Sequence, residues 1–252
     1  MPSENTNYIG SQTPVSVILI AYNEAKTIKN DVESFYGTIV AKLPGSELIV
    51  TEDGSTDGTS EILRDLADVL PIRLVQGKER KGYIRALFDA LELSSCEWIL
   101  FSDTGGKFNP QDFWKLEPYR ESADLIVTVK IFRKDQLYRR LMTLVFNHIA
   151  SIFFGVSVQD IDSGFRLYHR SLLEGITAED MIFKDLINAE FSLRMLARGA
   201  RLQEVPVIAT ARTDQSRGMP PKKIPRVIVQ VLKSFPRLKK ECKVLKKKAG
   251  NY

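Results

Sequence analysis

Residues 15–21 read Val-Ser-Val-Ile-Leu-Ile-Ala, and this short run is the clearest structural signal in the chain. The run is almost continuously apolar, which is typical of a strand in a sheet that helices cover on both faces. A polar cluster, Tyr22-Asn23-Glu24, follows it directly. The stretch therefore predicts a central buried strand with functional side chains beyond its carboxyl end.

Strand and helix patterns alternate outward from this run. Further strands are predicted at 47–51, 72–75, 97–102, 124–130 and 203–210, with a short one inside 160–168. Helices are predicted at 25–42, 60–69, 82–93, 136–154 and 184–198. Helices of this length between strands favour right-handed crossovers, so the fold class is α/β with a mostly parallel sheet flanked by helices.

Polar clusters follow three of the predicted strands. They are Tyr22-Asn23-Glu24, Glu52-Asp53-Gly54-Ser55 and Asp103-Thr104-Gly105. In open parallel sheets, ligands bind beyond the carboxyl ends of the strands. We therefore expect these clusters to converge on one ligand site at that edge of the sheet.

The composition excludes several classes of protein. Apolar residues make up 44% of the chain and charged residues 27%, which indicates a folded domain rather than a disordered, collagen-like or polytopic membrane protein. The two cysteines, Cys96 and Cys242, lie far apart without a metal-type partner, as suits a reducing compartment. The polar start of the chain lacks an apolar signal-peptide core, so we expect a cytoplasmic protein.

The positive charge is concentrated at the carboxyl end. Residues 218–252 hold eleven Lys or Arg and one Glu, or +10, so the remainder carries −5 within the net charge of +5. An apolar stripe in this segment consists of Val227, Ile228, Val231, Leu232 and Phe235. A basic amphipathic tail of this kind predicts binding to an anionic membrane surface, and a solvated tail is the alternative. No nucleic-acid partner is expected, because the body has no basic and aromatic stacking platform.

A series of motifs resembles a known enzyme family. In chain order they are Ala21-Tyr-Asn-Glu-Ala25, Glu52-Asp-Gly-Ser-Thr-Asp-Gly-Thr59, Lys81-Gly82, Ser102-Asp103 and Ser163-Gly-Phe-Arg166. They resemble the family 2 glycosyltransferases. The later motifs, with Arg139, Arg140 and Thr143, resemble the subgroup of dolichyl-phosphate mannose synthase and related polyprenyl-phosphate hexose transferases. The resemblance implies a GT-A (nucleotide-diphospho-sugar transferase, Rossmann-like) fold, a nucleotide-sugar donor and inversion at the anomeric carbon.

The resemblance covers residues 14–217 and implies a division of the chain. We expect a flexible N-terminus at 1–13, a nucleotide-sugar half at 14–110, an acceptor half at 111–217 and the basic tail at 218–252. The residues implied for donor binding are Tyr22, Glu24, Asp53, Gly54, Ser55, Lys81, Asp103, Thr104 and Lys107. Asp53 could accept hydrogen bonds from the imide of a base, and Gly54 could let the backbone approach that base. The alternative for this motif is a plain turn in which Asp57 or Thr59 caps a helix.

Cations dominate the sites expected for the acceptor, since two phosphorylated molecules must approach each other there. The residues implied for acceptor-phosphate binding are Lys130, Arg139, Arg140, Thr143, Ser163, Arg166, Arg212 and Arg217. Asp103, Arg166 and Asp160 are the expected catalytic residues. A phosphate acceptor would need no base, whereas a hydroxyl acceptor would need one, for which Asp160 and Asp162 are the candidates.

The metal site departs from the family pattern. The subgroup carries Asp-x-Asp followed by Gly-Gln, which holds Mg²⁺ or Mn²⁺ on the donor diphosphate, and Asp103 would be the ligand here. Gly105 and Lys107 replace the usual second Asp and the Gln. We therefore hypothesise that Lys107 takes over part of the role of the metal, and the competing interpretation is a degenerate donor site.

The sequence as a whole predicts an inverting transferase that acts peripherally on the cytoplasmic side of a membrane. Its donor would be a UDP- or GDP-hexose and its acceptor a polyprenyl (dolichyl-type) phosphate. The alternatives are a glycan or other hydroxyl acceptor, or a nucleotide-sugar-binding protein without catalysis.

Overall fold

The computed structural model describes residues 13–131, 137–155, 157–183, 186–208 and 224–249. Within these ranges the strands are β1 (Val15–Ala21), β2 (Glu47–Glu52), β3 (Ile72–Gln76), β4 (Trp98–Asp103), β5 (Leu125–Ile131), β6 (Phe165–His169) and β7 (Leu202–Ile208). The helices are α1 (Ile28–Thr38), α2 (Thr59–Val69), α3 (Tyr83–Leu93), α4 (Phe113–Leu116), α5 (Leu137–Phe154), α6 (Ile187–Ala197) and α7 (Ile224–Ala249). Short 3-10 helices are η1 (Val40–Lys42), η2 (Pro110–Asp112), η3 (Glu117–Tyr119), η4 (Arg170–Leu173) and η5 (Ala178–Asp180).

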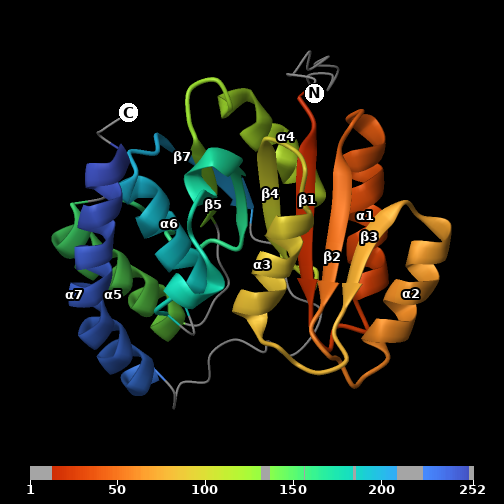
Figure 1. The fold of residues 1–252 in the computed structure, drawn as a ribbon, viewed down its shortest axis with the longest axis horizontal. Helices are drawn as coiled ribbons and strands as arrows, with labels where there is room; N and C mark the ends of the chain where they lie inside the picture. The colour runs from red at the N-terminus through yellow and green to blue at the C-terminus, as the bar shows by residue number, and fades with distance from the viewer. Residues whose placement is uncertain (1–12, 132–136, 156, 184–185, 209–223, 250–252) are drawn as a thin grey trace.

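The strands form one seven-stranded sheet in the order β3-β2-β1-β4-β6-β5-β7 (Figure 1). β1 runs parallel to β2 and β4, β2 to β3, and β5 to β7. β6 runs antiparallel to both β4 and β5, so β4 and β5 point the same way. The predicted mostly parallel sheet is confirmed, and the reversed strand β6 is the part of the topology that the apolar pattern did not indicate.

The side chains of β1 alternate between two apolar layers, which explains its continuous apolar sequence. Val17 and Leu19 pack with Phe35 of α1 on one face of the sheet. Ile18 and Ile20 pack with residues of α3 and α6 on the other face. Burying side chains of this size stabilises a fold by roughly 1.5–3 kcal/mol each. The central strand is therefore held on both sides, and its carboxyl end is a fixed platform.

A third apolar cluster joins α5, α6 and α7. Its members from α7 are Val227, Val231, Phe235, Leu238 and Cys242, all buried. They pack with Ala150 of α5 and with Ala189 and Leu193 of α6. Val227, Val231 and Phe235 of the expected membrane-facing stripe therefore belong to the core, whereas Leu232 is 41% exposed, and binding of this helix to a membrane stays a prediction. Pro236 lies inside α7 without ending the helix.

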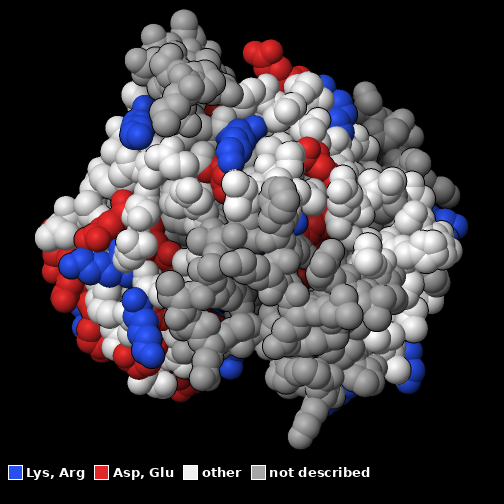
Figure 2. Space-filling model, turned by 180° about the vertical axis from the view of Figure 1, so that it is seen from behind, with Lys and Arg blue, Asp and Glu red and all other residues white. Residues whose placement is uncertain are grey.

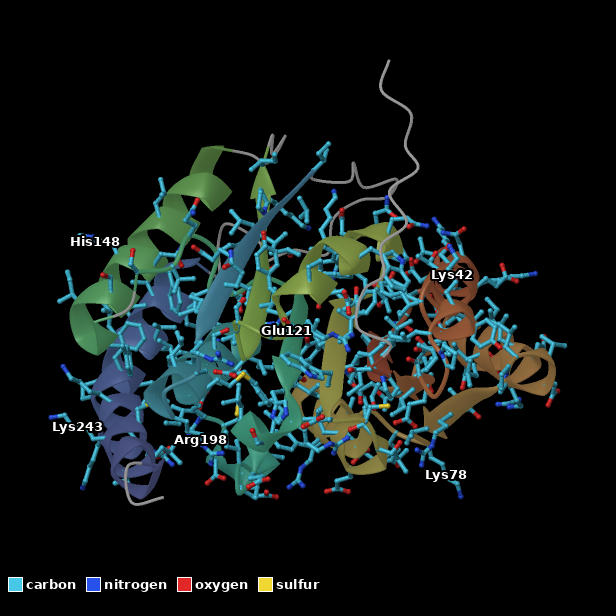
Figure 3. The ribbon with its side chains drawn as sticks, turned by 90° about the horizontal axis from the view of Figure 1, so that it is seen from above. Lys42, Lys78, Glu121, His148, Arg198 and Lys243 are labelled. Carbon is cyan, nitrogen blue, oxygen red and sulfur yellow. The ribbon has the colours of Figure 1, made fainter. Side chains whose placement is uncertain are left out.

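The outer side of α5 and α7 carries two different kinds of exposed residue. Leu144 and Ile152 of α5 are 66% and 67% exposed. The basic residues Arg226, Lys233, Arg237, Lys240 and Lys243 of α7 are exposed as well. His148 and Lys243 lie at this end of the molecule, away from Lys42 and Lys78 (Figure 3). Seen from behind, charged side chains gather at the end of the molecule that holds α1 and α2 (Figure 2). Over the ranges described, no helix combines the length and apolar character needed to cross a membrane.

Candidate functional site

The polar clusters that follow β1, β2 and β4 meet at one edge of the sheet. The strand register pairs Ala21 with Glu52 and Ile20 with Asp103, so the three strands end side by side. Hydrogen bonds then join the loops beyond them. The Asn23 amide donates to Ser55 Oγ at 2.8 Å, and the Glu24 amide donates to Thr59 Oγ1 at 2.8 Å. Ser55 and Thr59 thus fix the first two loops to each other.

Asp53 organises the loop that precedes α3. Its side chain is almost fully buried, and its Oδ1 accepts hydrogen bonds from the amides of Lys81 at 2.7 Å and Gly82 at 2.9 Å. Gly54 has a φ of +70°, and a Cβ there would lie 2.6 Å from the Arg80 amide nitrogen. The close approach that Gly54 permits is therefore to the backbone of residues 79 and 80, a neighbour that the sequence did not indicate.

Arg80 is the cation that the structure brings to Asp53. Its Nε lies 3.7 Å from Asp53 Oδ2, and its guanidinium lies 4.0 Å from the centre of the Tyr22 ring. Lys81 contributes its backbone to Asp53, whereas its ammonium pairs with Asp89 at 2.9 Å. Arg80 and Lys81 are adjacent in the sequence, and only the direction of the loop distinguishes them.

The turn interpretation of residues 53–59 is correct in part, because Asp57 supports a turn there, but the N-cap residue of α2 is Gly58 rather than Asp57 or Thr59. Asp57 Oδ1 accepts a hydrogen bond from the Thr59 amide at 3.1 Å, where α2 begins. Asp57 Oδ2 accepts another from the Ala25 amide at 3.2 Å. Burial acts to raise the pKa of Asp57, but these bonds from Thr59 and Ala25 outweigh it and lower the pKa. One motif therefore both starts a helix and shapes the site.

Asp103 stands at the end of β4, and its side chain is about one-quarter exposed. Its amide donates to the Gly164 carbonyl at 2.8 Å, and a Cβ at Gly164 would overlap its carboxylate. The Tyr83 hydroxyl lies 3.4 Å from Asp103 Oδ1, and Lys107 Nζ lies 3.4 Å from Oδ2. Asp103 is thus held by β6 from one side and paired with a lysine on the other.

The loop after Asp103 is fixed to the neighbouring elements. Thr104, expected at the donor, is buried, and its hydroxyl donates to the Ile20 carbonyl at 2.9 Å. The Thr104 hydroxyl therefore ties this loop to β1 and does not point toward a ligand. Asp31 of α1 accepts hydrogen bonds from the amides of Gly105 at 2.7 Å and Gly106 at 3.2 Å.

Asp31 is a site-shaping residue that sequence reasoning missed. Burial is the main reason that its pKa is raised, and the bonds from Gly105 and Gly106 partly oppose that rise. The signal was an acid beside the apolar face of the predicted 25–42 helix, next to Val32. Such an acid needs hydrogen-bond donors when it is buried, which here are the two glycine amides.

Lys130 lies at the same edge of the sheet, although we expected it at a separate acceptor site. Its ammonium donates to the Lys107 carbonyl at 3.3 Å and lies 3.8 Å from the centre of the Phe108 ring. This position follows from the strand directions, because β5 and β4 both end there. Lys107 and Lys130 are thus neighbours.

Arg166 does not occupy the open position that we expected. It is 1% exposed, and its Nη1 donates to the Asn188 carbonyl at 2.6 Å and to Ser192 Oγ at 2.9 Å. Its Nε donates to the Ser163 carbonyl at 2.9 Å. Burial is the largest cause that lowers the pKa of Arg166. The guanidinium therefore joins β6 to α6 from inside, and the expectation that Arg166 faces an open cleft is wrong.

Two further acids lie close to Arg166. Asp162 Oδ1 accepts a hydrogen bond from the Ala189 amide at 3.0 Å. Burial raises the pKa of Asp162 to about 7, the nearby Asp160 adds to the rise, and Arg166 opposes it. Asp160 is buried, and its carbonyl accepts a hydrogen bond from the Ser163 amide. A pKa near 7 is that of a group that exchanges protons near neutrality.

The remaining acceptor residues are only partly visible. Ser163 is buried, with its hydroxyl 2.8 Å from Thr128 Oγ1, so it is engaged inside the fold. Arg139, Arg140 and Thr143 belong to α5, but their side chains lie outside the described part of the structure. Arg212, Arg217 and the expected flexible N-terminus, apart from Thr13, lie outside the described residues altogether. Their roles stay predictions.

The side chains at Asp103 do not fit a divalent metal ion well. Within the part of the chain that the structure describes, no three His, Cys, Asp or Glu side chains gather as ligands would. Asp103 already has the Lys107 ammonium beside its Oδ2. Mg²⁺ and Mn²⁺ prefer several carboxylate and water oxygens, and a fixed positive charge next to the first ligand opposes them.

A protein-family model described as glycosyl transferase family 2 matches residues 16–177. The glycosyltransferase AglD of Haloferax volcanii is 29% identical over 202 residues, which are 77% of this chain and 32% of AglD. Polyprenol monophosphomannose synthase of Mycolicibacterium smegmatis is 25% identical over 212 residues, which are 78% of this chain and 77% of that enzyme. The chain thus spans about a third of the archaeal relative and most of the mycobacterial one.

The arrangement of the strands and helices also occurs in a solved structure. Glucosyl-3-phosphoglycerate synthase of Mycobacterium tuberculosis, solved with Mn²⁺, UDP and phosphoglyceric acid, matches with a TM-score of 0.65 at 20% identity. The match covers 88% of this chain and 78% of the other. Because the family model covers more than half of the chain, the chain belongs to glycosyl transferase family 2, and the structural likeness shows that it has the GT-A fold.

Proposed function

We propose that this enzyme transfers a hexose from a nucleotide diphosphate sugar to a polyprenyl phosphate, with inversion at the anomeric carbon. The observation that carries the proposal is the convergence of Tyr22, Asp53 and Asp103 beyond three parallel strands. The polyprenol monophosphomannose synthase supports the acceptor class, since its alignment includes more than three quarters of both chains.

The donor would lie along the ends of β2, β1 and β4. Asp53, Arg80 and Tyr22 would hold the nucleoside, because the Arg80 guanidinium lies 3.7 Å from the Asp53 carboxylate and 4.0 Å from the centre of the Tyr22 ring. Glu24, Gly54 and Ser55 shape the loops around that position. The diphosphate would lie toward Asp103 and Lys107, which leaves the hexose beside the start of β6.

The acceptor phosphate itself would be the nucleophile. A phosphate monoester is largely ionised near neutral pH, so one of its oxygens can attack the anomeric carbon without a base. The new bond joins that oxygen to the anomeric carbon. The bond from that carbon to the β-phosphate oxygen breaks, and its electron pair leaves with the nucleoside diphosphate. The protein supplies alignment and charge neutralisation.

A location at the cytoplasmic face of a membrane would suit a lipid-linked acceptor. The exposed cations of α7 support it, because a basic helix is attracted to anionic headgroups. Leu144 and Ile152 of α5 add exposed apolar surface at the same end of the fold. Co-sedimentation with vesicles of phosphatidylglycerol and phosphatidylcholine tests this, with vesicles of phosphatidylcholine alone as the control. Equal binding to both would contradict attraction by charge.

A hydroxyl acceptor, such as a glycan, is the second candidate, and Asp162 is the observation that favours it. Its pKa of about 7 suits a general base, which a hydroxyl nucleophile requires. In that case the hydroxyl proton would pass to Asp162 as the oxygen attacks the anomeric carbon. Asp162→Asn would then abolish transfer, whereas transfer to a phosphate would survive the substitution.

The test is the transfer of labelled hexose from UDP-glucose and GDP-mannose to dolichyl phosphate, followed by extraction into organic solvent. We expect label in the organic phase with the wild-type protein and a loss of at least about tenfold with Asp103→Asn. Lys42→Gln, at an exposed position before the start of β2 and so at the opposite end of that strand from Asp53, is the control. Label that appears only in a water-soluble glycan would favour the second candidate.

A further inference from the structure

We infer that Lys107 is a built-in cation that binds the diphosphate of the donor, that Lys130 supports it, and that donor binding therefore needs no divalent metal ion. The inference rests on the proposed function, because it takes a nucleoside diphosphate as the ligand. It assigns to two lysines the charge neutralisation that a metal ion would otherwise supply.

The loop of residues 104–106 holds Lys107 in a fixed position. Thr104 is tied to β1 through the Ile20 carbonyl, and both glycine amides are tied to Asp31 of α1. Lys107 comes directly after these anchors, and its ammonium lies 3.4 Å from Asp103 Oδ2. Both side chains are about one-quarter exposed, so the pair lies at the surface of the site and can meet a ligand.

The charges of Lys107 and Asp103 favour an anion over a metal ion as the ligand. An ammonium beside Asp103 already balances that carboxylate, and a divalent cation on the same oxygen would be repelled by it. A diphosphate oxygen would be attracted instead, because an ammonium has three donors and Asp103 uses only part of them. The same pair that opposes a metal ion therefore favours an anion.

Gly105, which has no side chain, fits the backbone conformation and the space at its position. Gly105 has a φ of +86°, and a Cβ there would lie 3.2 Å from Glu24 Oε2. An Asp at this position would bring a second carboxylate toward Glu24 and would strain the backbone. The loop is thus shaped around a glycine and a lysine, which argues against a decayed metal site.

Lys130 lies where it can support Lys107. Its ammonium lies against the Phe108 ring and donates to the carbonyl of Lys107, so the two lysines share one corner of the site. As the bond to the anomeric carbon breaks, negative charge grows on the departing diphosphate. Two nearby ammonium groups lower the energy of that charge without forming any bond.

The test measures binding rather than turnover. UDP and GDP are titrated into the full-length protein by calorimetry in EDTA and again in Mn²⁺, with UMP and GMP as probes that lack the second phosphate. For the wild-type protein we expect dissociation constants that agree within about threefold between EDTA and Mn²⁺. We also expect the diphosphates to bind more tightly than the monophosphates in both conditions.

Substitutions of Lys107 and Lys130 test which residue is responsible for metal-free binding of the diphosphate. Lys107→Gln should weaken diphosphate binding in EDTA by about tenfold, since it removes one charge-assisted hydrogen bond, and should leave monophosphate binding unchanged. Lys107→Arg should retain metal-free binding, and Lys130→Gln should have a smaller effect in the same direction. Lys42→Gln, at the opposite end of β2 from Asp53, is the lysine control.

The outcomes separate this inference from the proposed function. Diphosphate binding that disappears in EDTA and returns with Mn²⁺ would overturn the built-in cation and leave the donor class intact. Loss of Mn²⁺-supported binding in Glu24→Gln would then identify Glu24 as the missing ligand. An unchanged affinity in Lys107→Gln would also overturn the inference. No binding of any nucleotide in either condition would reject the donor class itself, and the inference with it.

Discussion

The donor edge and the acceptor half use their charged residues in opposite ways. At the donor edge, Asp103 and Lys107 are partly exposed, and their loops are fixed by hydrogen bonds to backbone amides. In the acceptor half, Arg166 and Arg194 are buried and satisfy groups inside the fold. The charges of Asp103 and Lys107 are therefore accessible to a ligand, whereas those of Arg166 and Arg194 are engaged inside the fold.

Helix α7 also differs between its two sides. Its apolar stripe and its lysines together predict a membrane-binding tail, yet Val227, Val231 and Phe235 of that stripe are part of the core. Its exposed side carries basic residues together with Val229, Leu232 and Val244. Amphipathic pattern alone does not distinguish packing against a protein from packing against a lipid surface, because both bury the same side chains.

The largest expected effect is on stability. Arg166→Ala removes a buried guanidinium and leaves the carbonyls of Ser163 and Asn188 without their donor. We expect a loss of about 3–5 kcal/mol in the free energy of unfolding, measured by urea denaturation. The matched control is Arg237→Ala on the exposed side of α7, which should change little. A fully stable Arg166→Ala protein that fails to bind acceptor would show that this arginine belongs to the site after all.

A smaller effect on stability is expected from Asp162. Its pKa rises from 3.8 to about 7, chiefly through burial, with Asp160 and Asp103 adding to the rise and Arg166 opposing it. Because the folded state holds this proton more tightly, the contribution of Asp162 is complete below about pH 4 and is lost as the pH rises through 7. Between about pH 4 and pH 7, the wild-type protein should lose stability relative to Asp162→Asn. Parallel stability curves for the two proteins would contradict the raised pKa.

The next largest effect is expected on nucleotide binding at the donor edge of the sheet. Asp53→Ala removes the acceptor for the amides of Lys81 and Gly82, and so releases the loop before α3. We expect nucleotide binding to weaken by about tenfold or more in calorimetry. Asp65→Ala, at an exposed position on α2, is the matched acidic control and should bind normally. Normal binding by Asp53→Ala would remove this residue from the site.

The smallest effect is expected at Lys81. Its ammonium forms an exposed pair with Asp89, and its backbone amide, which contacts Asp53, is kept in Lys81→Gln. Nucleotide affinity should change by less than about threefold, in line with the small energies of surface pairs. Arg80→Gln should weaken binding more than Lys81→Gln. The reverse order would restore Lys81 as the phosphate-binding cation.

Much of this arrangement could be predicted from sequence, and the exceptions have physical reasons. The strands, the helices and the convergence at Asp53 and Asp103 follow from apolar periodicity and the geometry of parallel sheets. The reversed direction of β6 could not be predicted this way, because a short apolar strand has the same pattern in either direction. Arg80 and Asp31 required knowledge of loop direction and helix packing. The burial of Arg166 required knowing that α6 covers it.

The central claim is that the nucleotide sugar binds where β1, β2 and β4 end. Hydrogen–deuterium exchange of the full-length protein, with and without the nucleotide sugar that raises its melting temperature most, tests this directly. We predict slower exchange in residues 21–25, 52–59, 77–83 and 103–108. A different hollow of about 550 Å³ lies between α3 and residues 170–179, lined by Phe88, Glu92 and Leu173 among others. Protection confined to that hollow, with no change at the strand ends, would contradict the account.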